Sequence, residues 1–138
     1  MPASATQFTV LVVEDVEPLR KMVRRMLLDG GYAVIEAANG QEALSALERH
    51  ANGIHLLLTD LLMPGMNGAE LAREASRISP ALPILFMSGY ADDPLVNDIA
   101  NHASSFVPKP FTAPVLVAKV RETLTRSASD GTDLGSAP

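Results

Sequence analysis

The segment Val10-Leu11-Val12-Val13-Glu14-Asp15 places two carboxylates directly after four consecutive apolar residues. Four further short segments share this apolar character: Ala33–Ile35, Leu56–Leu58, Ile84–Met87 and Phe106–Val107. Most of them are continuously apolar rather than alternating, which is typical of strands that helices cover on both faces. The sequence therefore predicts five buried strands.

Stretches with helical periodicity separate these predicted strands. In the first, after Pro18, apolar residues recur on one helix face, and the stretch ends at the glycine pair that begins at Gly30. Asp93 and Pro94 suit the start of the fourth stretch, and Thr112 opens the fifth. The alternation of strand and helix predicts an α/β fold, a doubly wound five-stranded parallel sheet with five helices on both faces.

The composition restricts the chain to one domain. It has 138 residues, of which 47% are apolar, and a net charge of −5. We expect a flexible leader over residues 1–7, a single domain over 8–127 and a flexible tail over 128–138, with no output domain.

The absence of cysteine excludes disulfides and thiolate chemistry. The acidic balance argues against direct nucleic-acid binding, and neither a targeting signal nor a membrane span is visible, which predicts a cytoplasmic protein.

Polar residues whose side chains can take part in catalysis or ion binding follow or end four of the predicted strands. They are Glu14 and Asp15 after the first, Asp60 after the third, Ser88 at the end of the fourth and Lys109 after the fifth. In a parallel α/β sheet these ends meet at one edge, where ligands bind. The sequence therefore predicts three carboxylates, a hydroxyl and an ammonium in one site.

Such a set of groups suits phosphoryl transfer. Three adjacent carboxylates repel one another unless a cation joins them, and a hard divalent ion such as Mg²⁺ prefers oxygen ligands. A carboxylate can attack a phosphoryl group and form an acyl phosphate. Lys109 can then offset the charge on the phosphoryl oxygens.

Four segments together resemble the receiver domain of two-component response regulators, and the resemblance extends from Phe8 to Arg126. The segments are Val10–Asp15, Thr59–Gly68, Met87–Tyr90 and Val107–Phe111. Their joint order and spacing make the resemblance specific. It implies a flavodoxin-like sheet with strand order 2-1-3-4-5.

The resemblance also implies a role for each polar residue of the site. Asp60 is the expected phosphoacceptor. Glu14 and Asp15 match the acidic pair that binds Mg²⁺, or Mn²⁺ in its place, with Asp60 and the backbone carbonyl of Leu62. Ser88 matches the hydroxyl residue that turns toward the phosphoryl group. Three positions depart from the family's most frequent residue. Glu14 stands where Asp is more frequent, Ser88 where Thr is, and Phe106 where Tyr is.

Further roles follow from the same resemblance. Lys109 matches the invariant lysine, and its bond to Pro110 is expected to be cis. Phe106 matches the aromatic residue whose rotamer follows the hydroxyl. Leu62 and Tyr90 flank the phosphorylation site, and we expect these two side chains to hinder the attacking water and lengthen the phosphoryl lifetime.

The function that the resemblance implies is a signalling switch rather than an enzyme with external substrates. The chain would catalyse only its own phosphorylation and slow autodephosphorylation. Its partners would be a sensor histidine kinase or a histidine phosphotransfer protein, and a downstream protein target that reads the surface of the fourth helix, fifth strand and fifth helix. We expect a monomer, with dimerisation on phosphorylation as an alternative.

Three alternatives come from other classes of protein. A flavodoxin-like electron carrier would have a phosphate-binding loop after the first strand, where Glu14 and Asp15 stand instead. A phosphatase that uses Asp60 as nucleophile would require a general acid, and no suitable second acid follows Asp60. A pseudo-receiver would bind partners without phosphorylation, which the complete set of acids, hydroxyl and lysine disfavours.

Overall fold

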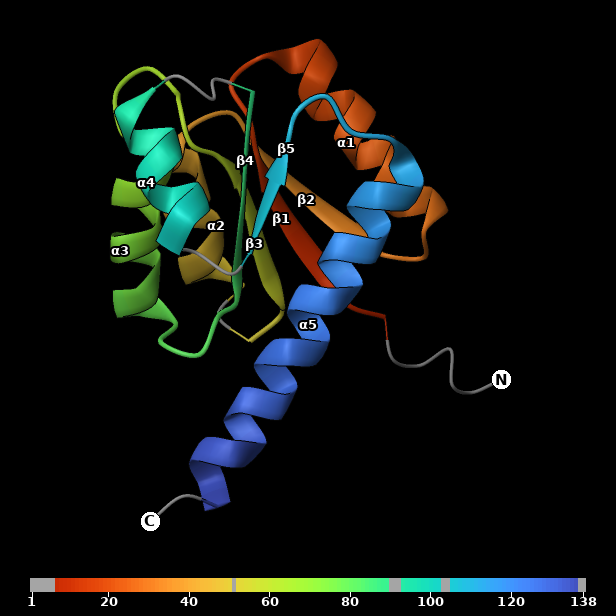
Figure 1. Cartoon of the computed structure of the whole chain (residues 1–138), viewed down its shortest axis with the longest axis vertical. Coiled ribbons are helices and arrows are strands. Elements are labelled where there is room, and N and C mark those ends of the chain that lie inside the picture. The colour runs from red at the N-terminus through yellow and green to blue at the C-terminus, as the bar shows by residue number, and fades with distance from the viewer. Residues whose placement is uncertain (1–6, 51, 90–92, 103–104, 137–138) are drawn as a thin grey trace.

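The protein folds into a five-stranded parallel sheet flanked by helices (Figure 1). The computed structural model describes residues 7–50, 52–89, 93–102 and 105–136. The strands run in the order β2-β1-β3-β4-β5, which confirms the predicted order. Their bounds are β1 Thr9–Val13, β2 Ala33–Ala37, β3 Leu56–Asp60, β4 Ile84–Ser88 and β5 Phe106–Pro108.

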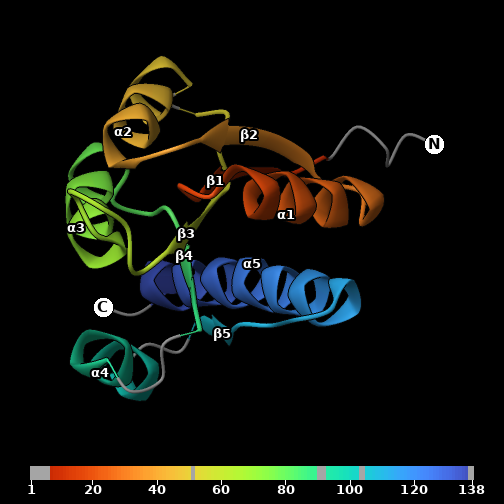
Figure 2. The ribbon, with the colours of Figure 1, turned by 90° about the horizontal axis from the view of Figure 1, so that it is seen from above.

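Among the residues that the structure describes, five helices cover the two faces of the sheet. They are α1 Glu17–Asp29, α2 Gly40–Arg49, α3 Gly68–Ile78, α4 Pro94–His102 and α5 Ala113–Ser136. Seen from above, α1 and α5 lie on one side of the sheet and α2, α3 and α4 on the other (Figure 2). This arrangement confirms the predicted doubly wound architecture.

The continuous apolar character of the strands follows from this two-sided cover. Val10 and Val12 of β1 pack into the core beneath α1 and α5, whereas Leu11 and Val13 pack into the core beneath α2 and α3. All five residues of β3, the central strand, are buried. Since successive side chains of a strand point to opposite faces, an apolar residue is needed at the four buried positions of β1, Val10–Val13, and at most positions of β3.

Side-chain caps mark the starts of α3 and α4. Asn67 and Glu70 form a reciprocal capping box at α3, in which each side chain accepts a hydrogen bond of 2.9 Å from the other residue's backbone N–H. At α4, Asp93 Oδ1 accepts a hydrogen bond of 2.8 Å from the backbone N–H of Leu95. The predicted cap at Asp93 is therefore present, and α3 begins at a fixed point after β3.

The last helix is longer than the sequence predicts. The Ser-, Gly- and Asp-rich composition predicts a flexible tail over residues 128–138, yet α5 continues to Ser136 (Figure 1). Extension of an existing helix needs no new nucleation, so residues of modest helix propensity can join its end.

In the described part of the chain, no helix has both the length and the apolar character needed to span a membrane.

Candidate functional site

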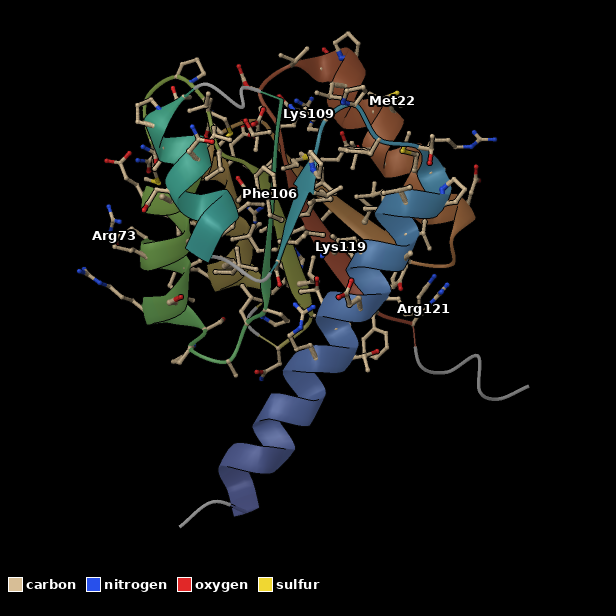
Figure 3. All side chains as sticks on the ribbon, in the orientation of Figure 1. Met22, Arg73, Phe106, Lys109, Lys119 and Arg121 are labelled. Carbon is tan, nitrogen blue, oxygen red and sulfur yellow. The ribbon has the colours of Figure 1, made fainter. Side chains whose placement is uncertain are left out.

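The site lies at the edge of the sheet where the strands end. Strand register places Val13 beside Thr59, and Asp60 beside Met87. Ser88 in turn lies beside Pro108. The residues that follow or end these strands therefore meet, as the sequence predicts, and Lys109 lies at this end of the sheet in Figure 3.

Lys109 joins two of the acidic side chains directly. Its Nζ lies 3.1 Å from Glu14 Oε1 and 2.9 Å from Asp60 Oδ2. These residues lie 95 and 49 positions from Lys109 in the sequence. Both carboxylates are almost fully buried, so the ammonium compensates negative charge that water reaches poorly.

Burial changes the acidity of this cluster. Burial, the largest cause, and the neighbouring Asp60 together raise the pKa of Glu14 from 4.5 to about 7, against the lowering effects of the Val16 N–H and Lys109. For Lys109, burial lowers the pKa, but the two carboxylates outweigh it and raise the value above 10.5. Lys109 therefore stays charged at neutral pH, while Glu14 is close to its own midpoint.

The acidic side chains fit the requirements of a divalent cation. Carboxylate oxygens of Glu14, Asp15 and Asp60 all lie within 4.8 Å of one another. Asp15 is exposed, whereas the other two are buried, so the cluster opens toward solvent on one side. Three oxygen donors with an open side suit Mg²⁺, which binds few carboxylates and keeps several other ligand positions.

The loop after β3 holds Asp60 through backbone contacts. The Leu61 N–H donates a hydrogen bond of 3.0 Å to the Met87 carbonyl, and the Gly68 N–H donates one of 2.9 Å to the Leu61 carbonyl. The Asp60 carbonyl accepts a hydrogen bond of 2.9 Å from the Thr59 hydroxyl. The backbone N–H of Leu62 donates a hydrogen bond of 3.3 Å to Asp60 Oδ1. The position of the Asp60 carboxylate thus depends on close packing of this loop.

We expect Gly68→Ala to weaken this packing. A methyl group there would lie 2.9 Å from Leu61 Cα and closer still to the Asp60 carbonyl oxygen, both of them backbone atoms. The expected loss is about 1–3 kcal/mol in the free energy of unfolding, measured by urea denaturation. Gly53→Ala is the control, because its methyl group would meet no atom closer than 3.7 Å. Equal stability of the two variants would contradict the close approach.

A small hollow lies beside Ser88. Its volume is about 100 Å³, and Ser88, Phe106 and Lys109 line it with residues of α4, namely Val96 and Asn97. Phe106 is half-buried and packs against the small core cluster that contains Val96. Ser88, Phe106 and α4 therefore border the same hollow.

The remaining predicted site residues have the following places. The Lys109–Pro110 peptide bond is cis, and the Lys109 N–H donates a hydrogen bond of 2.9 Å to the Ser88 carbonyl. Leu62 is half-buried directly after the buried Leu61. Tyr90 lies outside the described residues.

One further residue of the site, Arg20, is not among those that the sequence predicts. Arg20 of α1 donates a hydrogen bond of 2.9 Å from Nη1 to the carbonyl oxygen of Glu14. Its position one turn into a helix that follows the acidic pair was the available signal. Only the folded structure, however, shows that its side chain turns back toward the strand end.

A parallel sheet of this order with acids, a hydroxyl and a lysine at its carboxyl edge defines the class of receiver-like α/β domains. The family model of the response regulator receiver domain matches residues 10–121. The chain therefore belongs to the response regulator receiver domain family. Members of this family are phosphorylation-controlled signalling switches of two-component systems, and phosphorylation on aspartate and Mg²⁺ binding are typical of them.

Individual relatives agree with this membership. Sensor kinase CckA of Brucella abortus (strain 2308) is 38% identical over 119 residues, which cover 86% of this chain and 13% of CckA. The C4-dicarboxylate transport transcriptional regulatory protein DctD of Rhizobium meliloti (strain 1021) is 35% identical over 114 residues, 82% of this chain and 24% of DctD. This chain thus spans a small part of either relative.

The solved structures include the receiver domain of the hybrid histidine kinase CckA. It superposes with a TM-score of 0.72 at 35% identity and covers 84% of this chain and 98% of that domain. The similarity thus extends from sequence to the arrangement of the elements.

Proposed function

We propose that Asp60 of this receiver domain accepts a phosphoryl group from a phosphohistidine on a sensor histidine kinase or a histidine phosphotransfer protein. The observation that carries the proposal is the contact of Asp60 Oδ2 with Lys109 Nζ at 2.9 Å, beside the carboxylates of Glu14 and Asp15. This geometry holds a nucleophilic oxygen next to a mobile positive charge and a cluster that fits a divalent cation.

In the transfer step, a carboxylate oxygen of Asp60 forms a bond to phosphorus while the bond from phosphorus to the imidazole nitrogen breaks. The imidazole leaves with the electron pair of that bond and takes up a proton from solvent. A bound Mg²⁺ would supply positive charge to offset the transferring phosphoryl oxygens. Lys109, which holds Asp60 before the transfer, then donates hydrogen bonds to the phosphoryl group.

The hollow beside Ser88 supports a proposal for how the signal leaves the site. The Ser88 hydroxyl turns toward the new phosphoryl oxygens, and the Phe106 ring moves into the space that this movement frees. Because Val96 and Asn97 line the same hollow, the change reaches α4 directly. The altered surface of α4, β5 and α5 then binds a downstream protein target by a shift between two existing conformations.

We propose that the kinase or phosphotransfer protein docks at an apolar hollow beside the site. Its volume is about 480 Å³, and Leu19 and Met22 of α1 line it together with Lys109, Pro110 and Phe111. Met22 is 45% exposed and lies at the same end of the molecule as Lys109 (Figure 3). A helix that packs here would bring a phosphohistidine close to Asp60.

We expect Leu62→Asn to shorten the lifetime of the phosphoryl group. A polar amide could orient the attacking water, which apolar Leu62 cannot do, and a tenfold effect corresponds to roughly 1.4 kcal/mol of transition-state stabilisation. The measurement is the decay of the phosphorylated form by intact mass after removal of the phosphodonor. Leu62→Met, which keeps the site apolar, is the control, and equal decay rates of all three proteins would refute the expectation.

Treatment with acetyl phosphate tests the proposed function itself. In the presence of Mg²⁺, the wild-type chain should gain the mass of one phosphoryl group, and a chelator should prevent the gain. A wild-type chain that gains no mass over a range of phosphodonor and Mg²⁺ concentrations would refute the proposal.

A further inference from the structure

Arg20 forms a bridge between two parts of the chain that lie beside the acidic site. Its Nη1 donates a hydrogen bond of 2.9 Å to the Glu14 carbonyl, and its Nε donates one of 3.0 Å to Glu36 Oε1. The side chain is only 13% exposed, compared with 46% for Arg24, which lies one turn further along α1. Arg20 is therefore held in place by two partners, unlike an ordinary surface arginine.

The bridge fixes the peptide group between Glu14 and Asp15. The Glu14 N–H donates a hydrogen bond of 3.2 Å to the Ala37 carbonyl at the end of β2, and the Glu14 carbonyl accepts from Arg20. The backbone is thus held on both sides of the Glu14 Cα. Because Asp15 begins at the far end of the peptide that Arg20 holds, the direction of its side chain depends on this contact.

Glu36 in turn holds Arg20. It lies on β2 beside Val12, and its carboxylate contacts Arg20, Lys21 and Arg24 at 3.0–3.3 Å. Burial would raise the pKa of Glu36, but hydrogen bonds from Lys21 and Arg20 outweigh it and lower the pKa below its usual value. Glu36 is therefore ionised at neutral pH and anchors the guanidinium.

We propose that Arg20, oriented by Glu36, is a positioning residue that holds the Glu14–Asp15 peptide so that both carboxylates can bind one divalent cation together with Asp60. The inference rests on the proposed function for the use of that cation. The guanidinium presents two donors in a fixed fork, which the single ammonium of a lysine cannot reproduce.

Two roles of Arg20 make opposite predictions for Mg²⁺ affinity. If Arg20 acted only as a positive charge near the site, its removal would reduce repulsion of Mg²⁺ and tighten binding. If Arg20 positions the acidic pair, its removal weakens binding by about tenfold, as is typical when a group that orients metal ligands is lost. The direction of the change therefore distinguishes the two roles.

The test is a titration of the whole chain with Mg²⁺, with the dissociation constant measured from backbone amide shifts. Arg20→Met should raise the dissociation constant by about tenfold, and Arg20→Lys should raise it as well, because the fork is lost although the charge remains. Arg24→Met is the matched control, since Arg24 contacts Glu36 from a position one turn further along α1, and it should leave the constant within about twofold.

Several outcomes decide the matter. Unchanged or tighter binding in Arg20→Met and Arg20→Lys would overturn the inference, as would a wild-type chain that binds no Mg²⁺. If Arg20→Met does not fold, Arg20→Lys decides alone. A wild-type chain that binds Mg²⁺ but accepts no phosphoryl group would refute the proposed function only, because the role of Arg20 is measured on Mg²⁺ binding.

Discussion

Replacement of Lys109 with methionine is expected to destabilise the metal-free protein by about 3 kcal/mol at a pH near 8. Lys109 Nζ contacts Glu14 Oε1 and Asp60 Oδ2, and both acids are buried. Methionine keeps an unbranched side chain, one atom shorter, but leaves two buried carboxylates without a cation. The measurement is the free energy of unfolding in urea with a chelator present.

Two comparisons separate the charge effect from a loss of packing. Lys119→Met is the control, because Lys119 lies 3.5 Å from the half-exposed Glu122 on α5, and we expect it to change stability by less than about 1 kcal/mol. In a Glu14→Gln background, Lys109→Met should cost less, since one of the two buried charges is already gone. Equal losses for Lys109→Met and Lys119→Met would contradict the importance of the buried contacts.

The stability of the wild-type protein without metal is expected to fall as the pH rises from about 5 to about 8. The pKa of Glu14 is 4.5 in the unfolded chain and about 7 in the folded one, so the folded state holds this proton more tightly. The stability that this proton contributes is complete below pH 4.5 and is lost as the pH rises through 7. The shift corresponds to about 3 kcal/mol.

Other shifted groups of the described chain act outside this pH window. The pKa of Lys109 is raised above 10.5, so its contribution is lost only at higher pH. The pKa of Glu36 is lowered below 4.5, so its contribution is already present above that value. Between these limits the dependence on pH reports mainly on Glu14.

Urea denaturation of wild type and Glu14→Gln at both pH values measures the effect. Glu14→Gln cannot ionise, so it should lose the dependence on pH and be the more stable protein at the higher value. Glu48→Gln, at an exposed position of α2, should keep the wild-type dependence. A wild-type curve parallel to that of Glu14→Gln would show that the buried acid does not titrate in this range.

Most of the fold, and the identity of the residues that form the site, could be predicted from the sequence because both depend on local patterns. Continuous apolar runs such as Val10–Val13 predict strands covered on both faces, and parallel strands bring their ends to one edge. The meeting of Glu14, Asp60 and Lys109 follows from that rule alone. Their proximity was therefore predictable without knowledge of the side-chain contacts.

What the sequence could not provide depends on contacts between distant residues. It placed three carboxylates together but did not show that Lys109 already joins Glu14 to Asp60. Nor did it show how deeply Glu14 is buried, which sets its pKa. The role of Arg20 depends on how α1 packs against β2, and the length of α5 depends on helix extension beyond a change in composition.

The central claim is that Asp60 itself accepts the phosphoryl group, and the most direct measurement locates that group. After reaction with acetyl phosphate and Mg²⁺, borohydride reduces an acyl phosphate to the alcohol, so a phosphorylated aspartate becomes homoserine. Peptide mapping by mass spectrometry should find homoserine at position 60, and Asp60→Asn should accept no phosphoryl group. Homoserine at another position, or equal phosphorylation of Asp60→Asn, would contradict the account.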